Sequence, residues 1–140
     1  MFLLDTNVIS ELRKPRPHGA VLQWYGTVSL NQIAIPAVVI AELQAGAERT
    51  RRQDPAKSLE LELWIDQMML KIPILPMDGA IFREWARLMV GKSDDLSEDA
   101  MIAATARIRQ LTVVTRNEKD FAHFGVPVLN PFLTNPTVQL

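Results

Sequence analysis

Short apolar runs alternate along the chain with longer stretches in which apolar residues recur at helical spacing. The short runs predict strands at residues 2–4, 33–35, 72–76, 111–115 and 126–129. The run at 72–76 contains two prolines and suits a connecting or edge strand, because proline cannot donate to a sheet ladder. The longer stretches predict helices at residues 6–12, 21–28, 38–49, 59–70, 81–90 and 97–108.

Strands that alternate with helices predict an α/β fold with a parallel sheet of four to five strands, flanked by helices that make right-handed crossovers. The helix expected at 97–108 is rich in alanine, so it can approach the sheet closely. Functional groups in such folds collect beyond the carboxyl ends of the strands. Candidate chemistry is therefore expected where polar residues follow a strand.

The length of 140 residues corresponds to about one domain, which we expect at residues 1–133, followed by a loose tail at 134–140. Hydrophobic residues make up 48% of the chain, which suffices for a core without covalent staples. The absence of cysteine excludes a disulfide scaffold, a thiol nucleophile and a thiolate zinc site. With 15 basic and 16 acidic residues the net charge is −1, so any phosphate binding must come from local patches.

No segment predicts a membrane span. The longest apolar run, residues 33–41, contains Pro36 and is much shorter than the roughly 20 residues that a membrane helix needs. Asp5 interrupts the N-terminal apolar stretch, so no signal peptide is expected and the predicted location is the cytoplasm.

Four acidic residues are placed where chemistry is expected. Asp5 ends the first strand, and Glu42 lies on a helix face whose neighbours one turn away are apolar or small. Asp99 falls in the first turn of the alanine-rich helix, and Asp120 lies in the loop expected after the strand at 111–115. If the topology is as predicted, the four side chains converge at one edge of the sheet.

Carboxylates that lie close together repel one another unless a cation lies between them. Mg²⁺ and Mn²⁺ prefer hard oxygen ligands and leave coordination positions for water and a substrate phosphate, which suits hydrolysis of a nucleic-acid backbone. Each acid also has a purely structural interpretation. Asp5 can cap a helix, Asp99 can interact with a helix dipole, and Glu42 and Asp120 can be solvated surface charges.

Four blocks of sequence carry a resemblance to a known family: LDTNVIS at residues 4–10, IAEL at 40–43, DAMIAATA at 99–106 and VTRN at 114–117. In this order they resemble the PIN-domain ribonucleases, and within that superfamily the VapC toxins of bacterial toxin–antitoxin pairs, including the FitB-like branch. The resemblance extends over about residues 2–133, nearly the whole chain. Four ordered blocks are far more specific than a single motif.

The resemblance implies a Rossmann-like PIN fold, a Mg²⁺- or Mn²⁺-dependent endoribonuclease, a homodimer and a cognate VapB-like antitoxin that blocks the site. Its acidic positions correspond to Asp5, Glu42 and Asp99, with a metal ion on Asp5 and Asp99. Family members place a fourth acid either where this chain has Asn117 or where it has Asp120. The fourth catalytic position and a second metal ion therefore stay open, with Asp120 as the acid available.

Several polar residues can support such a site. Thr6, Asn7 and Thr115 can orient Asp5 or a metal-bound water, and Asn117 adds an amide at the end of the same strand. Arg116 can contact the scissile phosphate of an RNA. Two basic clusters can follow an RNA backbone, contact an antitoxin or simply be solvated: Arg13, Lys14 and Arg16, and Arg49, Arg51 and Arg52.

Two other functions are compatible with parts of the pattern. A phosphatase with Asp5 as nucleophile normally needs a second aspartate two residues later, where this chain has Asn7. A non-cleaving FitB-like component of a DNA-binding toxin–antitoxin complex is the second alternative, in which DNA is reached only through the antitoxin. No motif in the chain identifies the RNA that a nuclease of this kind would cleave.

Overall fold

The computed structural model describes residues 1–140 and contains a five-stranded sheet in which all neighbouring strands run parallel. The strands, in chain order, are β1 (Phe2–Leu4), β2 (Ile33–Pro36), β3 (Ile74–Leu75), β4 (Thr112–Val114) and β5 (Val128–Leu129). Their order in the sheet is β3-β2-β1-β4-β5. The predicted parallel α/β sheet is therefore confirmed, including the short edge strand β3.

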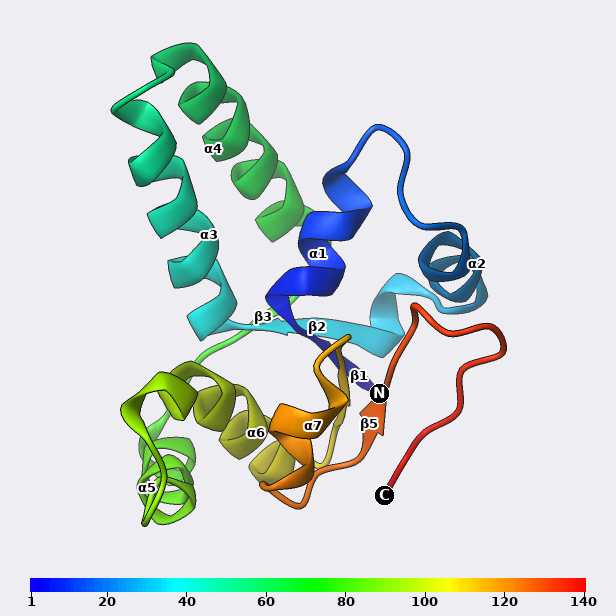
Figure 1. Ribbon diagram of the computed structural model, residues 1–140, viewed down its shortest axis with the longest axis vertical. Coiled ribbons are helices and arrows are strands. Elements are labelled where there is room, and N and C mark those ends of the chain that lie inside the picture. Colours follow the sequence, from blue (N-terminus) through cyan, green and yellow to red (C-terminus); the bar gives the residue numbers. More distant parts are fainter.

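The helices form layers on the two sides of this sheet, with α1 to α4 on one side and α5 to α7 on the other (Figure 1). Their bounds are α1 Thr6–Arg13, α2 Gly19–Thr27, α3 Ala37–Arg51, α4 Pro55–Lys71, α5 Gly79–Leu88, α6 Ser97–Arg109 and α7 Glu118–Ala122. Two short 3-10 turns, Leu30–Gln32 and Asp94–Leu96, precede β2 and α6. The pair α3 and α4 forms a long helical hairpin that extends away from the sheet (Figure 1).

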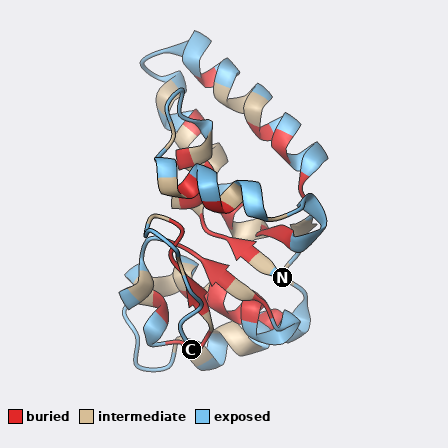
Figure 2. Cartoon of the chain, turned by 90° about the vertical axis from the view of Figure 1, so that its right-hand side faces the viewer, coloured by how far each residue is buried: buried red, intermediate tan, exposed pale blue.

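The core lies between these layers, and the strands are its most buried part (Figure 2). Leu3, Leu4, Val113 and Val114 have no exposed surface, as expected for a parallel sheet covered on both faces. The alanines of α6 are also fully or almost fully buried: Ala100, Ala103, Ala104 and Ala106. Their small side chains let α6 pack directly on the sheet, as the sequence predicts.

Aspartates fix the starts of several helices. Asp54 accepts a hydrogen bond from the backbone N–H of Lys57 at 3.0 Å, and Pro55 occupies the first helical position, where its missing N–H has no consequence. Helix α4 therefore begins before residue 59, where the apolar periodicity starts. Asp78 caps α5 in the same way, through the N–H of Ile81 at 3.0 Å.

The prediction of a loop around Asp120 is wrong, because that residue lies in helix α7. A helix of five residues is too short to show periodicity in the sequence, and it forms because Phe121 is fully buried beside Phe124. Residues 134–140 contain no helix, but Gln139 pairs antiparallel with Val128 through two backbone hydrogen bonds of 2.7 and 2.8 Å. None of the helices combines the length and apolar character that a membrane crossing requires.

Candidate active site

The candidate site lies at the carboxyl ends of β1 and β4, the two neighbouring strands at which the chain order of the sheet reverses. Strands β2 and β3 lie on one side of β1, and β4 and β5 lie on the other. Ligands of open parallel sheets bind at such a switch point, because the helices that follow the two strands pack on opposite faces and leave a crevice. Asp5 and Thr115 are the residues that directly follow these two strands.

Asp5 is the most buried of the candidate acids, with only 4% of its surface exposed. Its backbone N–H donates to the carbonyl of Val114 at 3.0 Å, which extends the pairing of β1 with β4 by one residue. One carboxylate oxygen, Oδ1, accepts from the N–H of Thr6 at 2.7 Å. The other, Oδ2, accepts from the hydroxyl of Thr115 at 2.8 Å and from the amide of Asn7 at 3.2 Å.

These contacts do not fully offset the burial of the charge. Burial raises the pKa of Asp5, the hydrogen bonds from Thr115, Thr6 and Asn7 act in the opposite direction, and the charge of Asp120 raises it further. The pKa therefore stays above its ordinary value. Asp5 is held in one orientation by three donors and would be stabilised further by a nearby positive charge.

Asn7 links the two strand ends. Its Nδ2 donates to Asp5 and to the Thr115 hydroxyl, the latter at 3.2 Å, and its Oδ1 accepts from the backbone N–H of Arg116 at 3.1 Å. The Thr115 hydroxyl also accepts from the N–H of Asn117 at 3.0 Å. The predicted supporting residues Asn7 and Thr115 are thus in contact with Asp5, while Asn117 contributes only its backbone.

Glu42 reaches the site from α3 and is held by Thr6, whose hydroxyl donates to Glu42 Oε2 at 2.9 Å. The Thr6 side chain therefore orients Glu42, while its backbone N–H binds Asp5. Burial raises the pKa of Glu42 to about 7, together with the charges of Glu98 and Asp5, although the Thr6 hydroxyl lowers it. At neutral pH this carboxyl group exists in both protonation states.

Asp99 enters from the first turn of α6 and is partly buried. Burial raises its pKa to about 6, and the charges of Asp5, Asp120 and Glu98 raise it in the same direction. Asp120, on α7, thus affects the ionisation of both Asp5 and Asp99. The structure brings these three aspartates and Glu42 to the same edge of the sheet, as their order in the sequence predicts.

Glu98 also belongs to this cluster, although the sequence pattern did not predict it as a site residue. It is adjacent to Asp99, and its negative charge raises the pKa of Glu42. The available signal was its place in the first turn of α6, one residue before a predicted site acid. A glutamate at that position is also common as a simple response to the helix dipole, so the sequence could not distinguish the two roles.

Arg116 follows Thr115 and lies beside Phe132, with its guanidinium carbon 3.7 Å from the ring centroid. Such a cation–π contact holds the arginine against an aromatic face and leaves its N–H groups free to bind an anion. The involvement of Phe132 could not be read from the sequence, because nothing in the pattern pairs residue 132 with residue 116.

The donor set fits a small divalent cation. No group of three or more His, Asp or Glu side chains is arranged to hold a metal ion by itself. Mg²⁺, however, usually keeps several waters and binds through one or two carboxylates rather than in a complete protein cage. Asp5 and Asp99 offer hard oxygen ligands, and the pKa of each is raised because burial and neighbouring negative charge disfavour its ionised form.

Comparisons with known proteins agree with this geometry. The PIN domain family matches residues 2–127. Toxin FitB of Neisseria gonorrhoeae is 34% identical and covers 94% of this chain and 99% of its own. VapC ribonuclease Y4jK of Sinorhizobium fredii is 32% identical, with coverages of 94% and 98%.

The fold is shared with a solved structure of FitAB bound to an IR36 DNA fragment, at 30% identity and a TM-score of 0.82. That match covers 96% of this chain and 98% of the other. The parallel sheet, the acidic residues that follow β1 and begin α6, and the similarity over nearly the full length lead to one assignment. The chain belongs to the PIN domain family, in the group that includes FitB and the VapC ribonucleases.

Proposed function

We propose that this protein is a divalent-metal-dependent endoribonuclease that acts as the toxin of a toxin–antitoxin pair. The observation that carries the proposal is the convergence of Asp5, Asp99 and Asp120 at the switch point of the sheet, where Asp120 raises the pKa of Asp5, and Asp5 and Asp120 both raise the pKa of Asp99. A cation bound among these carboxylates would relieve their repulsion and favour their ionised forms. Relatives named as ribonucleases support a nucleic-acid backbone as the substrate.

In this proposal Asp5 and Asp99 hold Mg²⁺ or Mn²⁺. When bound, such an ion lowers the pKa of a coordinated water and neutralises charge on the phosphate. Thr115, Asn7 and the Thr6 N–H keep the Asp5 carboxylate in a fixed position for this task. The hydroxyl of Thr6 holds Glu42, and a pKa of about 7 suits this residue for accepting or donating a proton at neutral pH.

Asp120 rather than Asn117 is our choice for the fourth acidic position. The charge of Asp120 acts on both Asp5 and Asp99, whereas the side chain of Asn117 makes no hydrogen bond to either. Arg116, held on Phe132 next to Thr115, is the candidate contact for the scissile phosphate. A titration that counts bound Mn²⁺ ions per protomer decides whether Asp120 binds a second metal ion or only adds negative charge near the first.

The test is cleavage of total RNA by the purified protein with Mg²⁺ or Mn²⁺ and with a chelator. We expect cleavage with the ions only, and a loss in the Asp5→Asn and Asp99→Asn variants. Asp66→Asn is the matched control, because Asp66 is exposed on α4. Cleavage by Asp5→Asn or Asp99→Asn at the wild-type rate would refute the proposal.

We further propose that a small antitoxin protein binds this chain and blocks the site, and that the chain forms a homodimer. The support for the antitoxin is the family relationship to a protein named as toxin FitB, and the homodimer is what the resemblance to the VapC toxins implies. An RNA cleavage assay with the product of the adjacent reading frame, combined with light scattering of the free chain, tests both points. Wild-type cleavage in the presence of excess partner would contradict the first, and a monomeric mass the second.

A second candidate is a component that assembles on DNA with its antitoxin and does not cleave RNA. It is favoured by the similarity to the FitAB structure, which contains a DNA fragment. In that case the acidic cluster would bind a metal ion without turnover, and the complex rather than the free chain would bind operator DNA. RNA cleavage by the free chain would exclude this candidate.

A further inference from the structure

A polar groove opens beside the acidic site, between α1, α3 and α4. It has a volume of about 510 Å³, which is within the usual range for ligand-binding clefts. Thr6 and Glu42 form its wall on the side of the site, so the groove and the site share two residues. A molecule bound at the carboxylates therefore lies directly beside the groove.

Two arginines line this groove, Arg13 from α1 and Arg49 from α3. Neither forms an ion pair with a carboxylate. The guanidinium of Arg13 instead lies 5.8 Å from the ring centroid of Trp64, another residue of the groove. Both cations are thus available to a ligand with negative charge.

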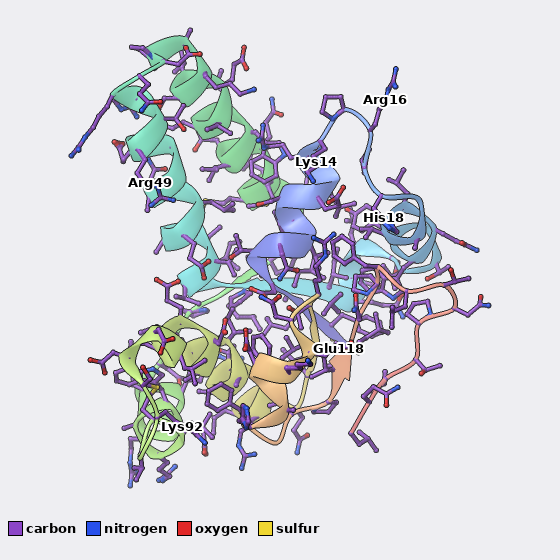
Figure 3. All side chains as sticks on the ribbon, in the orientation of Figure 1. Lys14, Arg16, His18, Arg49, Lys92 and Glu118 are labelled. Atoms are coloured by element: carbon purple, nitrogen blue, oxygen red, sulfur yellow. The ribbon has the colours of Figure 1, made fainter.

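Two of the neighbouring basic residues, Lys14 and Arg51, differ in this respect because their charges are paired. Lys14 pairs with Glu11 at 3.0 Å, and Arg51 pairs with Glu48 at 3.0 Å and also with Glu62. In Figure 3, Arg16 extends away from the body of the protein, whereas Arg49 lies on α3. Arg16 and Arg52 also form no ion pair, but of the two basic clusters only Arg13 and Arg49 line the groove.

The remaining lining suits a nucleotide chain better than a peptide helix. Only 4 of the 12 lining residues are hydrophobic, and Ser10, Thr50 and Gln53 add hydrogen-bonding groups. An amphipathic peptide helix requires an apolar groove. A pocket of that kind, with 8 hydrophobic residues of 10 and a volume of about 300 Å³, is present separately between α1, α2 and α4.

We propose that this polar groove, defined by Arg13, Arg49, Gln53 and Trp64, binds the single-stranded RNA that flanks the bond to be cleaved. Arg13 and Arg49 bind backbone phosphates, and the polar lining contacts the sugar and base edges. The two cations also offset the repulsion that the acidic site exerts on an approaching RNA. This proposal rests on the proposed endoribonuclease function and adds a substrate-binding subsite to it.

The first test measures RNA binding without cleavage. A fluorescein-labelled single-stranded RNA of about 12 nucleotides, a length that single-strand-binding sites commonly occupy, is titrated with protein in a chelator and followed by anisotropy. Arg13→Gln and Arg49→Gln are each expected to weaken binding several-fold. Each is also expected to reduce the slope of log affinity against log salt by about 0.7, the value for one lost phosphate contact on a single strand.

Arg83→Gln is the matched control, because Arg83 is an exposed helical arginine without an ion pair on α5, on the opposite side of the sheet (Figure 1). We expect this variant to bind like the wild type. A steric variant beside Arg49, whose Nη2 a Cβ at residue 46 would meet at 3.7 Å, gives a second check without a change in charge. Gly46 also lines the groove, so Gly46→Leu fills part of it and is expected to weaken RNA binding.

The second test separates this proposal from the proposed function. Cleavage of a long RNA by Arg13→Gln and Arg49→Gln is expected to show a raised KM. The increase is expected to be much smaller for a dinucleotide, because each arginine lies seven residues, or about 10 Å along its helix, beyond the residue that the groove shares with the site. A wild-type protein that cleaves no RNA refutes the proposed function, but the binding test still decides the subsite. The subsite proposal would be overturned if both arginine variants bound RNA and showed a KM like the wild type. If these variants also lost antitoxin binding, the groove would be assigned to the protein partner instead.

Discussion

Replacement of Asp99 by asparagine should stabilise the metal-free protein at neutral pH, although it removes a proposed metal ligand. The reason is that Asp99 is ionised there among other acids. Burial and the charges of Asp5, Asp120 and Glu98 raise its pKa from 3.8 to about 6, so the fold disfavours the charge. Asparagine has nearly the same shape and no charge, and it therefore relieves the repulsion.

The magnitude follows from the pKa. A rise from 3.8 to about 6 corresponds to about 3 kcal/mol for a group without solvent contact. Asp99 is partly exposed, and solvent screening reduces this value substantially. The substitution also removes a favourable interaction with the N-terminus of α6, worth about 0.3–1 kcal/mol. A net gain of about 1 kcal/mol remains, or a rise in Tm of about 3 °C for a domain of this size.

The expected gain in stability depends on pH. Because the folded-state pKa of Asp99 lies above its unfolded value, its contribution to stability is complete below about pH 4 and is lost as the pH rises through about 6. The gain from Asp99→Asn should therefore be absent near about pH 4 and fully developed at about pH 7.5. Differential scanning fluorimetry in a chelator measures it, with Asp66→Asn as the exposed control.

Mn²⁺ should reverse the order of stability. An ion that binds only the folded wild type stabilises it by about 2.7 kcal/mol when present at a hundred times its dissociation constant, and Asp99→Asn should lose most of this gain. Two outcomes would refute the reasoning. One is a metal-free variant less stable than the wild type at neutral pH, and the other is an equal gain at acidic and neutral pH.

Three further predictions concern neighbouring residues. Thr115→Val removes a donor to buried Asp5 and should lower the free energy of unfolding in urea by about 1–3 kcal/mol. Thr105→Val removes only a bond to a carbonyl of its own helix and should cost less, so equal losses would contradict the role of Thr115. Gly46→Ala should raise the same free energy by about 0.5–1 kcal/mol, because alanine loses less backbone entropy than glycine in a helix. The added methyl group fits, since its nearest neighbour is one side-chain atom at 3.7 Å, and a loss of stability would indicate strain in α3. Glu42→Gln should reduce the pH dependence of the free energy of unfolding of the metal-free protein between about pH 4.5 and 7, because the raised pKa of Glu42 makes the wild type lose stability across that range. An unchanged pH dependence would contradict the burial of Glu42.

Much of the fold could be predicted because its elements are long or strongly patterned. The buried strands and the alanine-rich helix α6 have distinctive composition, and alternation with helices leaves a parallel sheet as the natural arrangement. Helix α7 could not be predicted, because it exists through the burial of Phe121 rather than through its own periodicity. Helix α4 begins before its predicted start for a similar reason, because a capping aspartate and a proline extend it beyond the apolar pattern.

The sequence by itself determined which acids could meet. Asp5 follows a strand and Asp99 begins a helix that returns to the sheet, and the order of strands and crossovers then restricts both to one edge. Tertiary structure alone decided the environment of the side chains. The Thr6 hydroxyl donates to Glu42, and the charge of Glu98 acts on the same glutamate. Arg13 and Arg49 line the same groove although they come from different helices. The physical reason is that periodicity reports which face of an element is buried, whereas hydrogen bonds and charge interactions depend on distances between elements far apart in the chain.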